Sequence, residues 1–186
     1  ALEKKSTPSV LALSRQALTQ FRSGDMRENK TAKGAYLAVD SDGDRQITLI
    51  ASGSEVSIAI TAQMMLADAG ISAAVVSVPC LDLFFMQDTS YRNNLLGTAP
   101  RIVIEAGLQQ SWDRLLGHDD VFIGMDGFGR SAPINDLYNH FGITADAVIA
   151  AIAAIAVVAA VAAIAIMFAI ACIAVLAAIA ATAAMA

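Results

Sequence analysis

Three apolar runs restrict the folds open to this chain more than any other feature of its sequence. They are ISAAVVSVP (Ile71–Pro79), RIVIEAG (Arg101–Gly107) and VFIGMD (Val121–Asp126). Strands of a parallel sheet are nearly continuous in apolar residues because helices cover both of their faces. Helical segments separate these runs, so the sequence predicts an α/β fold with a mostly parallel sheet.

Two further strands are expected earlier in the chain. GAYLAVD (Gly34–Asp40) has alternating character, and QITLIAS (Gln46–Ser52) follows it after an Asp42-Gly43 pair. An Asp-Gly pair between two strand-like runs is typical of a β-hairpin. The sequence therefore predicts an open five-stranded sheet with helices on both faces, in which the hairpin adds one antiparallel edge strand.

The segment after this hairpin changes to helical periodicity. Ser52 and Glu55 have the spacing of a capping box, in which two side chains satisfy free amides at a helix start. We expect the helix to continue to Ala69, with Gly70 as its left-handed stop.

A second helix is marked at both ends. Pro133 suits the first turn of a helix and Gly142 suits the residue after its end. Thr144 is then expected to be the N-cap of a following helix. The negative charge of Asp146 would be favourable in the first turn of that helix.

Charge stops abruptly near the end of the chain. Every charged residue lies in the first 146 positions, and the 40 residues Ala147–Ala186 carry none. Large apolar residues recur there at every third position, beginning with Ile149 and Ile152. Three residues turn an α-helix by about 300°, so this spacing defines no single face.

Three interpretations of this tail stay open: a transmembrane or lipid-buried helix, a helix buried in an oligomer, and a low-complexity extension that is not native to the domain. Val157–Leu176 has no polar side chain over 20 residues, enough to cross a bilayer. Neither a basic flank nor an aromatic belt accompanies it. The regular triplet pattern favours the third interpretation, because it is neither a heptad nor an amphipathic helix.

Composition narrows the cellular setting. The net charge of −5 at pH 7 suggests a mildly acidic, soluble protein without affinity for nucleic acid. Cys80 and Cys172 lie far apart without a metal-binding spacing, which favours a reducing compartment. No signal peptide is recognisable, so we expect a cytoplasmic protein. Because the chain begins with Ala1, we also expect it to be part of a longer protein.

Few residues suggest chemistry. His118 and His140 have no carboxylate or cysteine at ligand spacing, so no metal site is predicted. Glu105 ends an apolar strand, at the end of an open α/β sheet where ligands bind; the alternative is a loop anchor. The glycine-rich segment Gly124–Pro133 lacks the spacing of a dinucleotide site and predicts tight turns. The residues alone predict no active site.

Six blocks of the sequence, in order, are STPSVLALSRQ, KGAYLAVD, ITLIASGSEVSIAI, AAVVSVPCLDLFFMQDTSYRNNLL, RIVIEAG and FIGMDGFGRSAP with LYNHFGIT. Together they resemble the C-terminal part of transketolases, over roughly Ser6–Val148. The sequence departs from this family at Arg130, where a small or acidic residue is usual, and in the uncharged tail.

The resemblance implies a subunit of three domains in a homodimer, with thiamine diphosphate and Mg²⁺ held by the first two domains. The third domain is an α/β unit with four parallel strands and one antiparallel strand. On this basis residues 1–16 end the pyrimidine-binding domain, 17–33 are a linker, 34–146 are the C-terminal domain, and 147–186 are the Ala-rich tail.

The resemblance also implies one substrate contact. The LSRQ segment would end the last strand of the pyrimidine-binding domain, Val10–Leu13, and its arginine would bind the phosphate of the sugar substrate. In this chain that residue is Arg15. A guanidinium group stays charged and matches the geometry of a phosphate, so the residue type suits the role.

The implied reaction is transfer of a two-carbon ketol unit between sugar phosphates in the pentose phosphate pathway. The cofactor-binding segments of the family precede Ala1, so we expect this chain to be inactive and to bind no cofactor alone. Dihydroxyacetone synthase is a close alternative. Two non-catalytic alternatives are a membrane-tethered interaction domain and a regulatory domain that binds metabolites near Glu105.

Overall fold

The computed structural model divides the chain into two compact units, residues 1–148 and 149–186. The first unit contains the whole sheet. The residues whose structure is described are 6–14, 17–22, 27–156 and 167.

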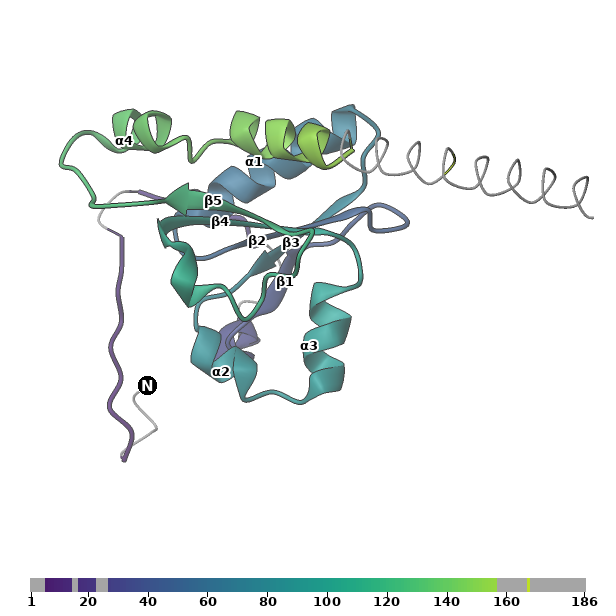
Figure 1. The fold of residues 1–186 in the computed structure, drawn as a ribbon. Helices are drawn as coiled ribbons and strands as arrows, with labels where there is room; N and C mark the ends of the chain where they lie inside the picture. Colours follow the sequence, from purple (N-terminus) through teal and green to yellow (C-terminus); the bar gives the residue numbers. More distant parts are fainter. Residues whose placement is uncertain (1–5, 15–16, 23–26, 157–166, 168–186) are drawn as a thin grey trace, which may run out of the picture. The chain divides into compact units, whose positions relative to one another are not determined.

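One five-stranded sheet forms the centre of the first unit (Figure 1). The strand order is β1-β3-β2-β4-β5; β2 to β5 are parallel, and β1 runs antiparallel to β3. This arrangement confirms the predicted mostly parallel sheet with one antiparallel edge strand. The strands are β1 (Tyr36–Val39), β2 (Ile47–Ala51), β3 (Ala73–Ser77), β4 (Arg101–Leu108) and β5 (Val121–Met125).

The predicted hairpin is wrong, because β3 lies between β1 and β2. Tyr36 of β1 pairs with Ser77 of β3, and Ile47 of β2 pairs with Ala73 at the other end of the same strand. Every residue of β2 and β3 is buried, whereas every residue of β1 is half-buried. A fully buried backbone needs hydrogen-bond partners on both sides, so β2 and β3 take interior positions and β1 takes the edge.

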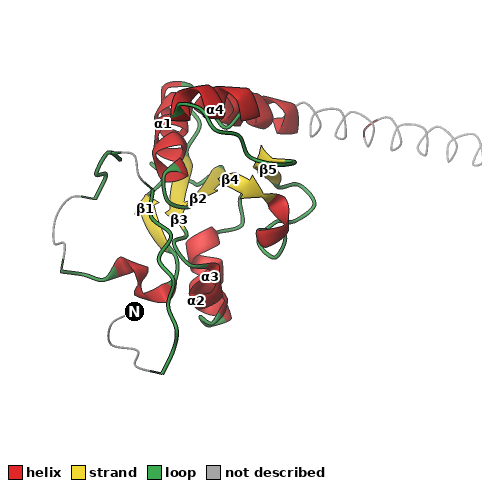
Figure 2. Cartoon of the chain, turned by 90° about the vertical axis from the view of Figure 1, so that its left-hand side faces the viewer, coloured by secondary structure: helices red, strands yellow, loops and turns green. Residues whose placement is uncertain are grey.

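Helices cover both faces of the sheet, as predicted. Figures 1 and 2 show α1 and α4 on one face and α2 and α3 on the other. The helices are α1 (Glu55–Asp68), α2 (Leu81–Phe85), α3 (Thr89–Leu96) and α4 (Ile134–Phe141), with short 3₁₀ turns η1 (Lys30–Lys33) and η2 (Gln109–Ser111).

The face under α2 and α3 holds a continuous apolar core. Ile50, Val76 and Val103, from three neighbouring strands, pack there with Phe84 of α2 and with Trp112. Burial of such side chains contributes roughly 1.5–3 kcal/mol each, which makes this layer a main source of stability. On the opposite face α1 packs against β2, β3 and β4.

Most predicted helix ends are confirmed. Gly70 is left-handed with φ 76°, and the backbone amide of Ile71 reaches back to the Leu66 carbonyl at 2.8 Å. Gly142 ends α4 with φ 66°. The Thr144 hydroxyl accepts a hydrogen bond from the Ala147 amide at 3.2 Å, as an N-cap does.

The strand predicted at Val10–Leu13 is absent from the described residues 6–14, which contain no strand. The side chains of Val10 and Leu13 are 94% and 82% exposed. A single extended segment is not a stable strand, because its amides and carbonyls need a paired neighbour.

One helical stretch of the described residues, Ile134–Ala156, is long and apolar enough to cross a membrane by length and composition alone. It includes α4, which belongs to the α/β unit, and the break at Gly142. The run Val157–Leu176, apart from Met167, lies outside the described residues.

Candidate functional site

Ser52 and Glu105 meet at the carboxyl end of β2. Ser52 directly follows β2, and Glu105 lies within the neighbouring strand β4, one residue after Ile104, which is in register with Ala51 of β2. The Ser52 hydroxyl donates a hydrogen bond to Glu105 Oε2 at 2.7 Å. The sheet therefore joins two polar residues that are 53 positions apart, at the end where the sequence predicted a ligand.

This contact also explains why the predicted capping box is wrong. Ser54, not Ser52, is the residue before α1, and it makes no side-chain cap. Only the Ser52 carbonyl serves the helix start, where it accepts a hydrogen bond from the Glu55 amide at 3.1 Å. The Ser52 hydroxyl therefore bonds to Glu105 of β4 and not to a backbone amide at the start of α1.

The Glu105 carboxyl titrates in an unusual range. Burial raises its pKa to about 7, the hydrogen bond from Ser52 acts in the opposite direction, and the charge of Glu55 raises it further. Desolvation is the dominant cause because it disfavours the charged form of a carboxyl group. Glu105 therefore changes its charge near neutral pH.

Glu55 is a second buried carboxylate close to this end of the sheet. Its side chain is only 4% exposed, and its Oε1 accepts hydrogen bonds from the Tyr138 hydroxyl at 2.7 Å and the Ser54 hydroxyl at 3.1 Å. The Tyr138 contact ties α1 to α4. Burial raises the pKa of Tyr138 to about 12, so this residue remains a hydrogen-bond donor. No spacing in the sequence indicated Tyr138.

A cavity of about 260 Å³ opens beside Glu105. Its polar lining includes Ser52, Glu105 and Ser111, and its apolar lining includes Val78 and Trp112. None of the described residues that line it carries a positive charge. The cavity thus combines one carboxyl group with an apolar wall.

A larger cavity of about 630 Å³ lies at the glycine-rich loop between β5 and α4. Gly124 is needed there for packing, because a Cβ atom would lie 2.7 Å from the Glu105 carbonyl oxygen and would meet the Phe122 ring. Phe128 at the loop tip is 99% exposed. Residues 126–133 form bends without a hydrogen-bonded turn, so the tight turns expected there are not observed.

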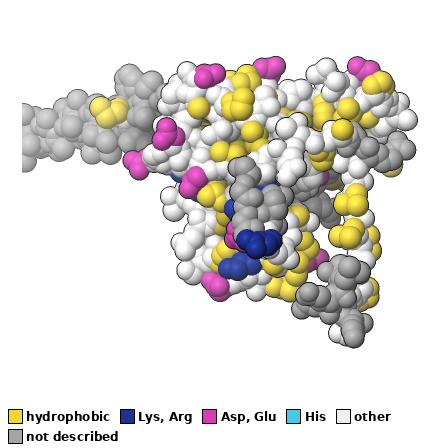
Figure 3. Space-filling model, turned by 180° about the vertical axis from the view of Figure 1, so that it is seen from behind, with side chains coloured by type: hydrophobic (Ala, Val, Ile, Leu, Met, Phe, Trp, Pro, Cys, Tyr) yellow, Lys and Arg dark blue, Asp and Glu magenta, His cyan; other side chains and the backbone are white. Residues whose placement is uncertain are grey.

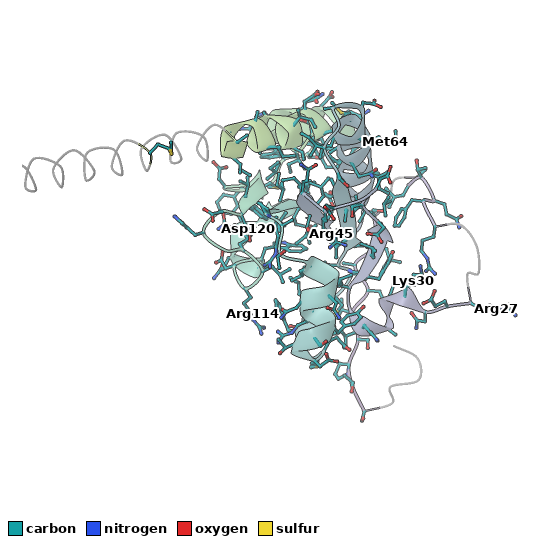
Figure 4. The ribbon with its side chains drawn as sticks, turned by 90° about the vertical axis from the view of Figure 1, so that its right-hand side faces the viewer. Arg27, Lys30, Arg45, Met64, Arg114 and Asp120 are labelled. Atoms are coloured by element: carbon teal, nitrogen blue, oxygen red, sulfur yellow. The ribbon has the colours of Figure 1, made fainter. Side chains whose placement is uncertain are left out.

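Other polar residues have structural partners. Asp120 accepts hydrogen bonds from the amides of Arg101 and Gly117, both at 2.7 Å, and so anchors the loop before β5. Arg45 donates to the Leu95 carbonyl at 2.9 Å, which fixes the loop before β2 to the end of α3. Figure 4 labels Asp120 and Arg45. Among the described residues, no three His, Cys, Asp or Glu side chains form a metal-binding group.

Basic and acidic side chains are distributed differently on one face of the molecule. On the face shown in Figure 3, the Lys and Arg side chains gather in one group, whereas the Asp and Glu side chains are spread over the surface. Three described cations pack on aromatic rings. Lys33 lies 4.3 Å from the ring centre of Tyr91, and Arg114 lies 3.7 Å from that of Phe85. Arg22 lies 5.8 Å from the ring centre of Tyr36. Arg15 lies outside the described residues, so its phosphate contact stays a prediction.

The unit just described coincides with a known domain. The family model of the transketolase-like TK C-terminal domain matches residues 34–144, which is more than half of the chain. The chain belongs to the transketolase family. This match begins two residues before β1 and ends after α4, so it covers the entire sheet.

Transketolase relatives extend the match beyond this domain. The chain is 56% identical over 151 residues to the transketolase of Sinorhizobium medicae and 53% identical over 149 residues to that of Cereibacter sphaeroides. These alignments cover 81% and 80% of this chain. The chain spans 22% of the length of each of the two relatives.

Solved transketolase structures show the same fold. The transketolase of Leishmania mexicana matches 63% of this chain and 17% of its own, with 40% identity and a TM-score of 0.58. That of Pichia stipitis in complex with sedoheptulose 7-phosphate matches 76% of this chain and 20% of its own, with 30% identity and a TM-score of 0.66. These findings favour the predicted transketolase portion over the non-catalytic alternatives.

Proposed function

We propose that residues 34–146 serve as the C-terminal domain of a transketolase that transfers a two-carbon ketol unit between sugar phosphates. The single observation that carries this proposal is the coincidence of the family match, residues 34–144, with the complete five-stranded unit. The sedoheptulose 7-phosphate in the Pichia stipitis structure supports the substrate class. In the full enzyme the proposed setting is a cytoplasmic homodimer.

Thiamine diphosphate and Mg²⁺ are the proposed cofactors of the full enzyme, in which thiamine diphosphate supplies the electron sink. The described residues of this chain do not suit either group. No described cation lines the Glu105 cavity to receive a diphosphate, and no described trio of side chains suits a metal ion. We therefore place the cofactor site in other domains of the enzyme, against which this domain docks.

A chimera tests the proposal. The C-terminal portion of Sinorhizobium medicae transketolase is replaced by residues 6–148 of this chain, and ketol transfer from xylulose 5-phosphate to ribose 5-phosphate is measured. We expect activity comparable to that of the parent enzyme, because the aligned segments are 56% identical. A folded, dimeric chimera without activity would contradict the proposal.

The isolated chain provides the second half of this test. We expect no ketol transfer and no micromolar binding of thiamine diphosphate in a calorimetric titration. Calorimetric binding of the cofactor to this chain would refute the assignment of the cofactor site to other domains.

Arg15 is proposed to bind the phosphate group of the substrate. In the active chimera, Arg15→Gln is expected to raise KM for sugar phosphates at least tenfold, because a charge-assisted hydrogen bond contributes on the order of 1.5–3 kcal/mol. The control is a substrate without phosphate, such as erythrulose, for which KM should not change. Equal effects on both substrates would show that Arg15 acts on stability instead.

A further inference from the structure

The cavity beside Glu105 has a built polar end. Ser52 directly follows β2, Glu105 lies within β4, and Val78, which follows β3, supplies part of the wall. The Ser52 hydroxyl fixes one oxygen of the carboxyl group at 2.7 Å, which holds the group in one direction. Three adjacent strands thus position a single acidic group at the mouth of a small cavity.

The charged groups around this cavity favour a ligand of positive charge. Glu55 lies near enough to raise the pKa of Glu105, and none of the described lining residues is positive. A phosphate group there would face the carboxyl group of Glu105 without a counter-ion among the described lining residues, and the buried charge of Glu55 nearby would add to the repulsion. A cation would instead stabilise the ionised form of Glu105.

The remaining residues that line the cavity favour a ligand with a small apolar part. Val78, Leu81 and Trp112 present an apolar surface next to the carboxyl group. The cavity has a volume of about 260 Å³ and is open to solvent, so it suits a small molecule or the end of a larger one. An amine with a short aliphatic chain offers both a positive end and an apolar body.

We propose that this cavity binds a small alkylammonium ion, with its ammonium group paired to Glu105 and its alkyl chain against Val78, Leu81 and Trp112. This site is separate from ketol transfer and does not depend on the proposed transketolase function. It is a binding site of the C-terminal domain itself.

Binding of this kind depends on pH. The titratable groups that face Glu105 are Glu55 from α1 and Tyr138 from α4, and Tyr138 stays neutral because burial raises its pKa to about 12. The titrating group is therefore Glu105, which loses its proton on binding the amine. We expect the affinity to rise about tenfold from about pH 6 to about pH 8, as the ionised fraction grows from about one-tenth to about nine-tenths.

The experiment titrates the full chain with n-butylammonium by isothermal titration calorimetry, and with butyrate and inorganic phosphate as matched probes. We expect saturable binding of one n-butylammonium per chain and none of the two anions. Binding of phosphate in place of the amine, or binding of neither up to tens of millimolar, would overturn the proposal.

Three variants locate the site. Glu105→Gln should reduce the affinity for n-butylammonium at least tenfold at pH 8 and should remove its pH dependence. Gly107→Leu keeps the carboxyl group but fills the cavity, since a Cβ atom on Gly107 would already lie 3.5 Å from Glu105 Cγ. Asp82→Asn removes a charge from an exposed residue of α2 and should leave binding unchanged.

These variants keep the test decisive when one of them is unstable. If Glu105→Gln does not fold, as judged by circular dichroism, loss of binding in Gly107→Leu supports the site. Unchanged affinity in either folded variant, or equal losses in Asp82→Asn and Glu105→Gln, would show that the amine binds elsewhere.

Discussion

The two ends of the parallel strands each hold a carboxylate that is largely buried, and the two carboxylates have different surroundings. At the amino ends, Asp120 accepts hydrogen bonds from two backbone amides and lies 3.9 Å from the Arg101 guanidinium. Near the carboxyl ends, Glu105 accepts hydrogen bonds from the hydroxyl and the backbone amide of Ser52 and has a second carboxylate, Glu55, nearby.

This difference separates a structural anchor from the group that we propose to bind a ligand. A carboxylate that is matched by several donors and a cation stabilises the loop it belongs to and has little left to offer a ligand. A desolvated carboxylate without a cation beside it keeps unused binding capacity and an elevated pKa, as functional groups often do. Asp120 is of the first kind and Glu105 of the second.

The largest effect is expected from removal of the anchor. Asp120→Ala leaves the Arg101 amide and the Gly117 amide without acceptors, which should lower the free energy of unfolding by about 3 kcal/mol. Chemical denaturation with urea measures the change. The neighbouring Asp119→Ala is the matched control, because this exposed side chain should change stability by less than about 0.5 kcal/mol. Equal losses of stability in the two variants would show that Asp120 does not anchor this loop.

Glu105→Gln should act in the opposite direction. Burial raises the folded-state pKa of Glu105 to about 7 from its ordinary value of 4.5, so the wild-type protein loses stability as pH rises between these values. The variant lacks this loss and should be more stable than the wild type at pH 8, by roughly 2 kcal/mol once partial exposure is allowed for. The two proteins should be alike near pH 4.

The measurement is the thermal midpoint of both proteins across this pH range. A wild-type midpoint that rises with pH, or a variant that is less stable at pH 8 than at pH 4 by the same amount as the wild type, would contradict the assignment of the titration to Glu105.

Tyr138→Phe tests the third carboxylate and should have the smallest effect. Loss of the hydroxyl removes the 2.7 Å hydrogen bond to buried Glu55, which should cost about 1.5 kcal/mol. Urea denaturation measures this loss. Tyr36→Phe, on the half-buried edge strand β1, is the matched control. An equal loss of stability in this control would show that the hydrogen bond to Glu55 does not stabilise the fold more than another tyrosine hydroxyl does.

The sequence predicted those parts of the fold that depend on neighbouring residues. Apolar runs located β3, β4 and β5, and Gly70 and Gly142 marked the ends of helices. The pairing of β1 could not be predicted, because it depends on β3, which lies more than 30 residues later in the chain. The Asp42-Gly43 pair favoured a local hairpin that the buried strand β3 excludes.

The candidate site shows the same limit. The sequence placed Glu105 at the end of its strand, whereas β4 continues to Leu108; Glu105 lies at the level where the neighbouring strand β2 ends. Its partners could not be predicted, because Ser52 also satisfied a local capping pattern. Tyr138 lies 83 positions from Glu55, and no sequence spacing relates the two.

The place of β3 between its two predecessors has a consequence for synthesis. When the ribosome has made β1 and β2, the strand that must join them does not yet exist, and the two cannot pair correctly with each other. These two strands can be joined only after β3, which ends at Ser77, has been synthesised and has inserted between them. A growing chain of this family therefore passes through an interval in which its earliest strands have open edges, and chaperones that shield such edges would act at that stage.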